Sequence, residues 1–229
     1  MFKEAKRGTR VPKILLTGPS GGGKTKSALR LMKGLIGDKP LALIDTENDS
    51  STIYANEFAF LVANLPKSEQ NVAGYQKVMN EAITDAKASG VIVDSITPAW
   101  KDIIDRSNKM DGNSFTNWGK LTPIQESFKD FIIAFPIPLV CTVRSKQGYV
   151  LELNEKGKNV PKKVGLEIEQ GKDIDYDFDI VFKIDQQTHF ASIDKCRYTE
   201  VEEYFTQNGG EILLTEEIGI IIRNIIRQQ

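Results

Sequence analysis

The chain has 229 residues, of which 40% are hydrophobic and 27% are charged, and its formal net charge is −1 at pH 7. This composition is typical of a soluble globular protein that buries a substantial core, and the length excludes two large domains. The balanced charge excludes a protein that coats nucleic acid through its overall positive charge, although it leaves room for a local basic patch.

The scarcity of cysteine and histidine limits the chemistry further. The chain has two cysteines and one histidine, which excludes a disulfide framework and a Cys/His zinc site. The first ten residues lack the apolar stretch of a secretory signal, and the apolar run at residues 131–143 is too short and too interrupted by proline to span a bilayer. We therefore expect a cytoplasmic protein with no membrane partner.

Short apolar runs alternate with amphipathic runs through the first two-thirds of the chain. In chain order, the pattern predicts a strand at residues 13–17, a helix at 24–36, a strand at 41–44, a helix at 70–88, a strand at 91–93, helices at 97–109 and 118–135, and a strand at 139–143. Continuous apolar strands that alternate with helices predict an α/β fold, with a mostly parallel sheet flanked by helices on both faces. Ligands of such sheets bind at the carboxyl ends of the strands.

The last third of the chain is richer in strand patterns. Residues 148–165 predict a β-hairpin around a polar turn at residues 154–158, and residues 180–184 and 190–193 predict another antiparallel pair. Residues 218–226 are apolar and predict a terminal element that packs back on the core. We therefore expect an antiparallel, β-rich C-terminal third.

Four glycines occur in residues 18–25, GPSGGGKT, between the first predicted strand and the first predicted helix. The stretch fits G-x-x-x-x-G-K-[ST] in the strand–loop–helix setting that this motif requires, which favours a phosphate-binding loop over a glycine-rich turn without a ligand. Its glycines let backbone N–H groups cradle phosphate oxygens at a helix N-terminus. The predicted nucleotide-binding residues are Gly18, Pro19, Ser20, Gly21, Gly22, Gly23, Lys24, Thr25 and Lys26.

Acidic residues end two of the predicted strands. Lys24 is expected to reach the β- and γ-phosphates, while the Thr25 hydroxyl binds Mg²⁺ and Asp94 holds the metal through its water shell. Glu47, at the end of the strand that we expect beside the phosphate-loop strand, is the candidate for polarising the attacking water. The alternative is that Glu47 and Asp94 are solvated acids at strand ends.

Ile44-Asp45-Thr46-Glu47, followed by Ile53-Tyr54-Ala55, resembles the core of RecA-type recombinases, in which a strand ending in D-x-E carries the catalytic glutamate. More specifically, residues 11–198 resemble the compact RecA-like ATPases of bacteriophages, a group usually described as AAA-type ATP-binding proteins that includes single-strand annealing and recombination proteins. The resemblance implies one RecA-like P-loop ATPase domain over residues 1–229, in the host cytoplasm, with ATP and Mg²⁺ as cofactors. Its nucleotide-binding core would span residues 11–145, and residues 146–229 would form the β-hairpin and C-terminal strands.

Arg144 follows the fourth strand of the core, where RecA proteins have a glutamine that senses the γ-phosphate. This departure fits the phage group better, and an arginine can contact phosphate through its fork of donors, although it cannot act as a neutral switch. The alternative is a basic surface pair formed by Arg144 and Lys146.

Lys195-Cys196-Arg197 resembles the paired basic finger of hexameric replicative helicases, which reaches the γ-phosphate of a neighbouring subunit. The resemblance implies that Lys195 and Arg197 are catalytic across an interface and that the protein forms a homo-oligomer, either a ring or a filament. The alternative is a solvated strand end.

Two segments lie where RecA-like proteins contact DNA. Residues 110–120 offer Phe115 and Trp118 for base stacking, although Trp118 could equally anchor a helix. Residues 144–163 interleave basic side chains with Tyr149, a combination that suits single-stranded DNA, although solvated lysines are the alternative. The basic residues of this segment are Arg144, Lys146, Lys156, Lys158, Lys162 and Lys163, and those near the N-terminus are Lys3, Lys6, Arg7, Arg10 and Lys13.

The resulting hypothesis is a Mg²⁺-dependent ATPase that acts on single-stranded DNA in phage recombination, annealing or replication, with other replication or recombination proteins as further partners. A nucleotide-type kinase and a non-catalytic nucleotide switch are the alternatives. A kinase would need an acceptor-binding domain and an arginine-bearing lid, which the sequence does not reveal, and Glu47 argues against a passive switch. The acidic run at residues 173–179 is expected to be a solvated lead-in to the next strand.

Overall fold

The structure is a computed structural model that describes residues 10–153, 159–171 and 173–227, with side chains described outside residues 147–166. The strands of this part of the chain are β1 (Lys13–Gly18), β2 (Leu41–Asp45), β3 (Leu61–Asn64), β4 (Gly90–Asp94), β5 (Leu139–Leu153), β6 (Asn159–Ile168), β7 (Ile180–Ile184), β8 (Ala191–Cys196) and β9 (Glu211–Ile212). The helices are α1 (Lys24–Ile36), α2 (Val72–Thr84), α3 (Thr97–Lys109), α4 (Ser114–Ala134), α5 (Thr199–Gln207) and α6 (Glu216–Arg227).

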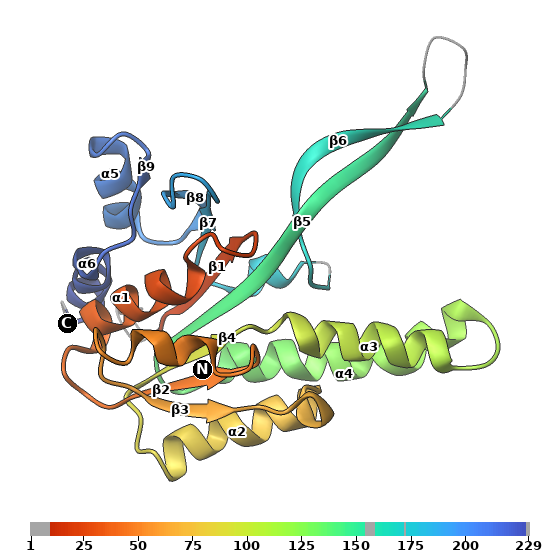
Figure 1. Ribbon diagram of the computed structural model, residues 1–229, viewed down its shortest axis with the longest axis horizontal. Coiled ribbons are helices and arrows are strands. Elements are labelled where there is room, and N and C mark those ends of the chain that lie inside the picture. Colours follow the sequence, from red (N-terminus) through yellow and green to blue (C-terminus); the bar gives the residue numbers. More distant parts are fainter. Residues whose placement is uncertain (1–9, 154–158, 172, 228–229) are drawn as a thin grey trace, which may run out of the picture.

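The strands form one mixed sheet in the order β3-β2-β4-β5-β1-β7-β8-β9 (Figure 1). Neighbouring strands are parallel from β3 to β7, whereas β8 and β9 are antiparallel to their neighbours. This arrangement confirms the predicted α/β class with a mostly parallel sheet and antiparallel strands late in the chain. The expectation that β2 lies beside β1 is wrong, because β4 and β5 separate them. Buried strands of similar composition do not reveal their order, which the crossover helices decide.

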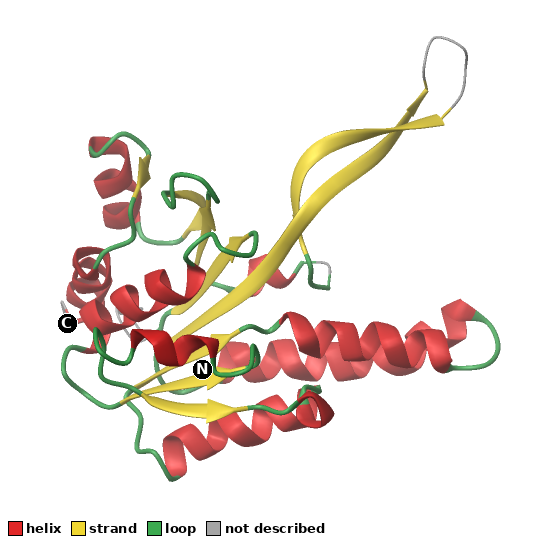
Figure 2. Cartoon of the chain, viewed as in Figure 1, coloured by secondary structure: helices red, strands yellow, loops and turns green. Residues whose placement is uncertain are grey.

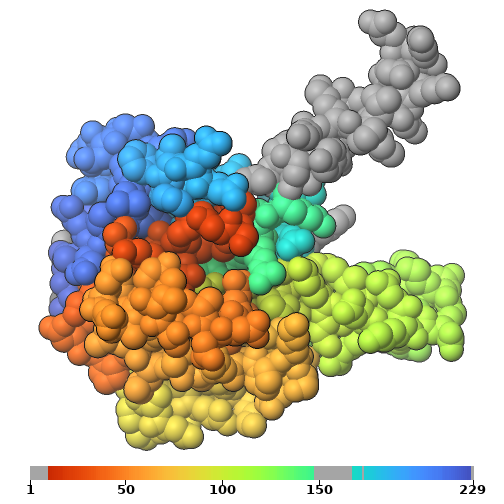
Figure 3. Space-filling model, in the orientation of Figure 1, coloured from red at the N-terminus to blue at the C-terminus, as the bar shows by residue number. Residues whose placement is uncertain are grey.

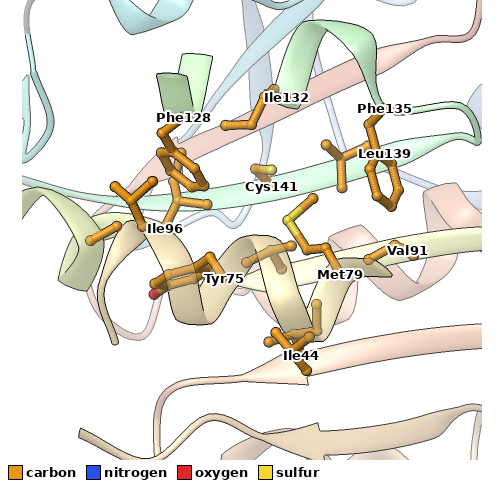
Figure 4. Packing of buried hydrophobic residues seen from close by; sticks show 14 of the residues in the cluster. Ile44, Tyr75, Met79, Val91, Ile96, Phe128, Ile132, Phe135, Leu139 and Cys141 are labelled. Atoms are coloured by element: carbon orange, nitrogen blue, oxygen red, sulfur yellow. The ribbon is translucent and has the colours of Figure 1, made fainter. Parts of the chain in front are cut away.

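The two faces of the sheet bury separate hydrophobic clusters, since successive residues of a strand point to opposite faces. On β1, Leu15 belongs to the cluster under α2, α3 and α4, while Ile14 and Leu16 belong to the cluster under α1, α5 and α6. Figure 4 shows the first cluster, in which Tyr75 and Phe128 lie close together and their ring centroids are 5.6 Å apart. Helices therefore cover both faces, as predicted.

Two hairpins project from this body, and both leave from the carboxyl edge of the parallel strands (Figures 1 and 2). One is a β-arm, defined here as residues 145–168, in which β5 continues beyond the sheet and pairs with β6 from Ser145 opposite Ile168. The predicted hairpin is thus present and longer than expected, while its turn, residues 154–158, lies outside the described residues. The other projection is the helical hairpin of α3 and α4.

Helix α4 begins at Ser114, earlier than predicted, because the side chain of Asn113 caps it. The Asn113 carboxamide oxygen accepts a hydrogen bond from the Phe115 N–H at 2.8 Å. Trp118 packs against Trp100 of α3 with ring centroids 5.7 Å apart, whereas Phe115 is 88% exposed. Trp118 therefore anchors the helical hairpin, and of the two aromatic side chains proposed for base stacking it is Phe115 that is free on the surface.

Candidate nucleotide-binding site

The glycine loop connects β1 to the N-terminus of α1, as its sequence predicts. Gly18 has φ 156°, and a Cβ at this position would lie 2.8 Å from the Ile184 carbonyl oxygen of the neighbouring strand β7. Gly23 is the N-cap of α1 with φ 87°, a left-handed conformation that glycine adopts without steric cost. Because this N-cap has no side chain, the first amides of the helix are open to an anion.

A cavity of about 460 Å³ lies against this loop. In the space-filling view, the surface of the loop and α1 (red) lies between the segment after β2 (orange) and the C-terminal part of the chain (blue) (Figure 3). Of the predicted site residues, those that line the cavity are Ser20, Gly21, Gly23, Lys24, Thr25, Lys26, Glu47, Asp94 and Arg144. Gly18, Pro19 and Gly22 complete the loop beside it.

Lys24 is held against the loop itself. Its ammonium donates hydrogen bonds to the carbonyl oxygens of Gly18 and Pro19 at 2.9 and 2.8 Å, and only 8% of the residue is exposed. Burial lowers the pKa of Lys24, while the nearby carboxylates of Asp94 and Glu47 act in the opposite direction. A phosphate in the cavity would meet a cation that is already desolvated and aimed at the loop.

Thr25 and Asp94 meet at the cavity although they come from different elements. The Thr25 hydroxyl donates to Asp94 Oδ2 at 2.5 Å, and the Thr142 hydroxyl donates to the other carboxylate oxygen. Asp94 is 4% exposed, and burial raises its pKa. Hydroxyl and carboxylate oxygens suit Mg²⁺, which takes few protein ligands besides phosphate and water. The donor set therefore fits the expected metal.

Asp45 organises the turn that carries Glu47. Its carboxylate accepts hydrogen bonds from the Glu47 N–H at 2.6 Å and, through the other oxygen, from the Ser51 N–H and hydroxyl at 2.9 and 2.6 Å. Thr46 joins this turn to the end of β4, since its N–H donates to the Asp94 carbonyl oxygen at 2.9 Å. The buried Asp45 of the D-x-E sequence thus shapes the backbone, and the half-buried Glu47 lines the cavity.

Glu47 forms an ion pair with Arg144. Its Oε1 accepts from Arg144 Nε at 2.9 Å and from Nη2 at 2.8 Å. The two side chains, 30% and 39% exposed, both line the cavity. Arg144 is thus paired with an acid at the cavity, and its contact with a phosphate stays a prediction.

Lys195 and Arg197 lie elsewhere. Strand β8 runs antiparallel to β7 and ends opposite Ile180, the first residue of β7. Lys195 and Arg197 therefore lie at the amino-terminal ends of the parallel strands, and the phosphate loop lies at their carboxyl ends. The Lys195 ammonium donates to the carbonyl oxygens of Asp175 and Tyr176 at 3.0 and 2.6 Å. Neither residue reaches the cavity of its own chain.

The surroundings of Asp179 differ from two expectations, one about the acidic run at residues 173–179 and one about the basic residues Arg10 and Lys13. Asp179 is fully buried, so the expected solvated acidic lead-in is wrong at this position, whereas Asp173 at the start of the run is exposed. The Asp179 carboxylate pairs with Arg10 at 2.5 Å and accepts the N–H of Lys13 at 3.0 Å. Lys13 is only 1% exposed and the Arg10 side chain pairs with Asp179, so neither is the free basic side chain that we expected. The other basic and aromatic side chains expected to contact DNA lie outside the described part of the chain. They are those of Lys3, Lys6, Arg7, Tyr149, Lys156, Lys158, Lys162 and Lys163.

The cavity also contains residues that the sequence analysis missed. Ser27, Arg30, Tyr54, His189 and Leu213 line it. Tyr54 belongs to the I-Y-A stretch, and Ser27 and Arg30 follow Lys24 at helical spacing, so these three had a sequence signal. His189 had no such signal, because it is far from the phosphate loop in the sequence and only the folding of the chain brings the turn after β7 beside that loop. The Gln186 side chain of that turn donates to the Ser20 carbonyl oxygen at 2.9 Å.

A family model described as "AAA domain" matches residues 10–213. The chain belongs to this family. The match spans the phosphate loop, both acidic strand ends and Arg144, so the AAA domain contains the whole cavity. Membership indicates a nucleotide-binding, P-loop ATPase with ATP as its nucleotide. No curated protein matches the chain. Among its described residues, no helix is long and apolar enough to cross a membrane.

Proposed function

We propose that this protein is a Mg²⁺-dependent, RecA-like ATPase that acts on single-stranded DNA in phage recombination, annealing or replication. The observation that carries the proposal is the convergence of Lys24, Thr25, Asp94 and Glu47 on one cavity, although they come from three separate segments of the chain. This set combines the phosphate cradle, oxygen ligands for a metal and an acid for the attacking water.

The chemistry follows from the positions of these side chains. Bound Mg²⁺–ATP supplies the phosphoanhydride bond and a cation that neutralises its charge. With the nucleotide bound, Lys24 would exchange the carbonyl oxygens of Gly18 and Pro19 for the β- and γ-phosphates, and Thr25 and Asp94 would hold the metal. Glu47 accepts a hydrogen bond from the attacking water and orients it for in-line displacement. Lys24 and Glu47 are therefore the catalytic residues in this chain's own cavity.

The two projections support a nucleic-acid substrate. The β-arm continues directly from Arg144, and α3 begins directly after the strand that ends in Asp94, so both are joined to the cavity by short connections. Basic residues are frequent in the sequence of the arm, and Phe115 exposes an aromatic face near the end of the helical hairpin. Basic side chains together with aromatic faces are the usual means of binding single strands.

The position of Lys195 and Arg197 supports an oligomer. Both are charged, and both lie at the end of the parallel strands opposite the cavity. A head-to-tail assembly would bring this end of one copy toward the cavity of the next copy. An arginine supplied in this way stabilises charge that develops in the transition state. The monomer alone is then a slow ATPase.

Phosphate release tests this proposal. We expect hydrolysis that single-stranded DNA stimulates, and Lys24→Ala should lower kcat by at least about a hundredfold because it removes a cation at the transferred phosphate. Lys33→Ala is the matched control, since this exposed lysine of the same helix pairs with Asp38 and does not line the cavity. Phosphate transfer to GMP would indicate a kinase instead, and binding without hydrolysis in any condition would indicate a switch.

A further inference from the structure

The ion pair of Glu47 and Arg144 occupies one oxygen of the proposed catalytic carboxylate. Both guanidinium donors bind the same oxygen, Oε1, at 2.9 and 2.8 Å. A carboxylate oxygen that accepts two charged donors has its lone pairs engaged and its charge largely neutralised. Oε1 is therefore blocked and the charge of the carboxylate is reduced, which leaves only Oε2 for a water proton and makes Glu47 a weaker acceptor in this arrangement.

The pair also stands between two hollows. Glu47 and Arg144 line the phosphate cavity, and both line a second cavity of about 530 Å³ that extends toward α3. Lys67, Lys101 and Asp105 are among the residues of this second cavity. The guanidinium consequently has space on either side, so it can change partner without displacing packed side chains.

The backbone of Arg144 is held by hydrogen bonds that do not involve its guanidinium. Its N–H donates to the Thr97 hydroxyl at 3.0 Å, and its carbonyl oxygen accepts the N–H of Glu169 at 2.7 Å. The Glu169 side chain pairs in turn with Lys101 of α3 at 3.3 Å. These contacts tie Arg144 to the base of the β-arm and to the start of the helical hairpin. Any change at the pair is therefore a movement of the guanidinium about a fixed main chain.

We propose that Arg144 is a positioning residue that restrains Glu47 until the terminal phosphate of a nucleoside triphosphate draws the guanidinium away. The inference rests on the proposed ATPase function and states when its catalytic acid, Glu47, is bound to Arg144 and when it is available to water. A terminal phosphate offers three charged oxygens, which match the fork of an arginine better than one carboxylate oxygen does. A diphosphate lacks that group and leaves the pair closed. Glu47 thus becomes available only when there is a γ-phosphate to hydrolyse.

A double-mutant cycle on nucleotide affinity tests this exchange. The variants are Arg144→Gln, Glu47→Gln and the double variant, and the ligands are the non-hydrolysable analogue AMP-PNP and ADP, both with Mg²⁺. Arg144→Gln should weaken AMP-PNP about tenfold or more and leave ADP within about twofold, because only the triphosphate gains the charged hydrogen bonds. Glu47→Gln should tighten AMP-PNP, because the arginine no longer has to leave a partner.

The decisive result is the coupling between the two positions. For AMP-PNP, the tightening caused by Glu47→Gln should be about two- to fivefold larger in the natural background than in the Arg144→Gln background, as expected for the loss of a partly exposed ion pair. Direct repulsion between Glu47 and phosphate acts in both backgrounds and cancels in the cycle. Equal fold-changes in the two backgrounds, or the same coupling with ADP, would overturn the proposal.

Arg106→Gln is the matched control. This arginine of α3 pairs with Asp102 at 2.8 Å with similar exposure, 45% and 30%, and does not line the phosphate cavity. It should leave both affinities unchanged, and equal unfolding temperatures would verify that the variants fold. Failure of the proposed function gives a different result, because the natural protein would then bind neither AMP-PNP nor ADP in a Lys24-dependent way.

Discussion

Lys13 is a buried cation at the beginning of β1. Its ammonium donates to the Val11 carbonyl oxygen at 3.0 Å, and the residue is 1% exposed. Burial lowers the pKa of Lys13 to about 8, although the carboxylate of Asp179 acts in the opposite direction. The folded protein therefore carries a proton on this side chain at neutral pH at the expense of stability.

We predict that Lys13→Met stabilises the protein by up to about 3 kcal/mol at pH 7, since a shift of one pKa unit corresponds to about 1.4 kcal/mol. Between pH 8 and pH 10.5 the unfolded chain keeps this proton and the folded chain loses it, so the natural protein gains stability as the pH rises. The advantage of the variant is thus complete below pH 8 and disappears above about pH 10.5.

Urea unfolding at pH 7 and at pH 10 measures this difference. Lys183→Met is the control, because Lys183 lies on the adjacent strand β7 with its side chain exposed. The control should change stability little at either pH. An advantage of Lys13→Met that is the same at both pH values would show that packing, and not the charge of Lys13, is responsible.

At the scale of elements, α6 docks on α1 through two glycines. A Cβ on Gly34 of α1 would lie 1.9 Å from the Glu216 carbonyl oxygen, and a Cβ on Gly219 of α6 would lie 2.2 Å from the Leu31 carbonyl oxygen. The backbones therefore approach too closely for any larger residue. The prediction that residues 218–226 pack back on the core is confirmed, and these glycines explain how closely they do so.

We predict that Gly34→Ala destabilises the protein by about 1–3 kcal/mol or more, because overpacking outweighs the better helix propensity of alanine. Gly119→Ala is the matched control, since Gly119 is also inside a helix and a Cβ there meets open space. The control should be neutral or slightly stabilising. Thermal unfolding of both variants provides the comparison, and similar midpoints would contradict the close crossing.

Strand β3, helix α5 and the two-residue strand β9 were not predicted, and the sequence signal differs between the first two. Strand β3 belongs to the continuous apolar run of residues 58–63, so its signal was present in the sequence and was not used, although Leu61 and Val62 are 54% and 41% exposed at the edge of the sheet. Helix α5 buries only Val201 and Phe205 and is otherwise polar, which gives a weak periodic signal. Elements with a clear pattern, such as the continuously buried β1 and the amphipathic α1, were predicted to within a residue or two.

At the scale of the whole molecule, the proposed trans action of Arg197 predicts complementation between inactive variants. Lys24→Ala has an intact finger, and Arg197→Ala has an intact cavity. In a mixed assembly, about a quarter of the interfaces join the intact cavity of one variant to the intact finger of the other, since a head-to-tail contact uses different surfaces of its two subunits. An equal mixture should therefore recover up to about a quarter of the natural activity.

Phosphate release from each variant alone and from the mixture measures this effect. Arg197 Nε also lies 3.6 Å from Asp179 Oδ1, so the fold of the variant must be verified by its unfolding temperature. Arg10→Ala is a useful comparison, because it removes the other arginine paired with Asp179 and should leave hydrolysis in place. No recovery in a mixture of folded, associated variants would show that Arg197 does not act across an interface.

The sequence by itself determined the phosphate loop, the acidic strand ends and the α/β class. These features depend on residues a few positions apart, since glycine conformation, helix periodicity and strand alternation are local properties. Only the tertiary structure decided that β4 and β5 separate β2 from β1, that Arg144 binds Glu47 across 97 positions, and that Lys13 is buried beside Asp179. Such contacts depend on which strands become neighbours in the sheet. The sequence does not reveal this order, because many strand orders would bury the same pattern of apolar residues.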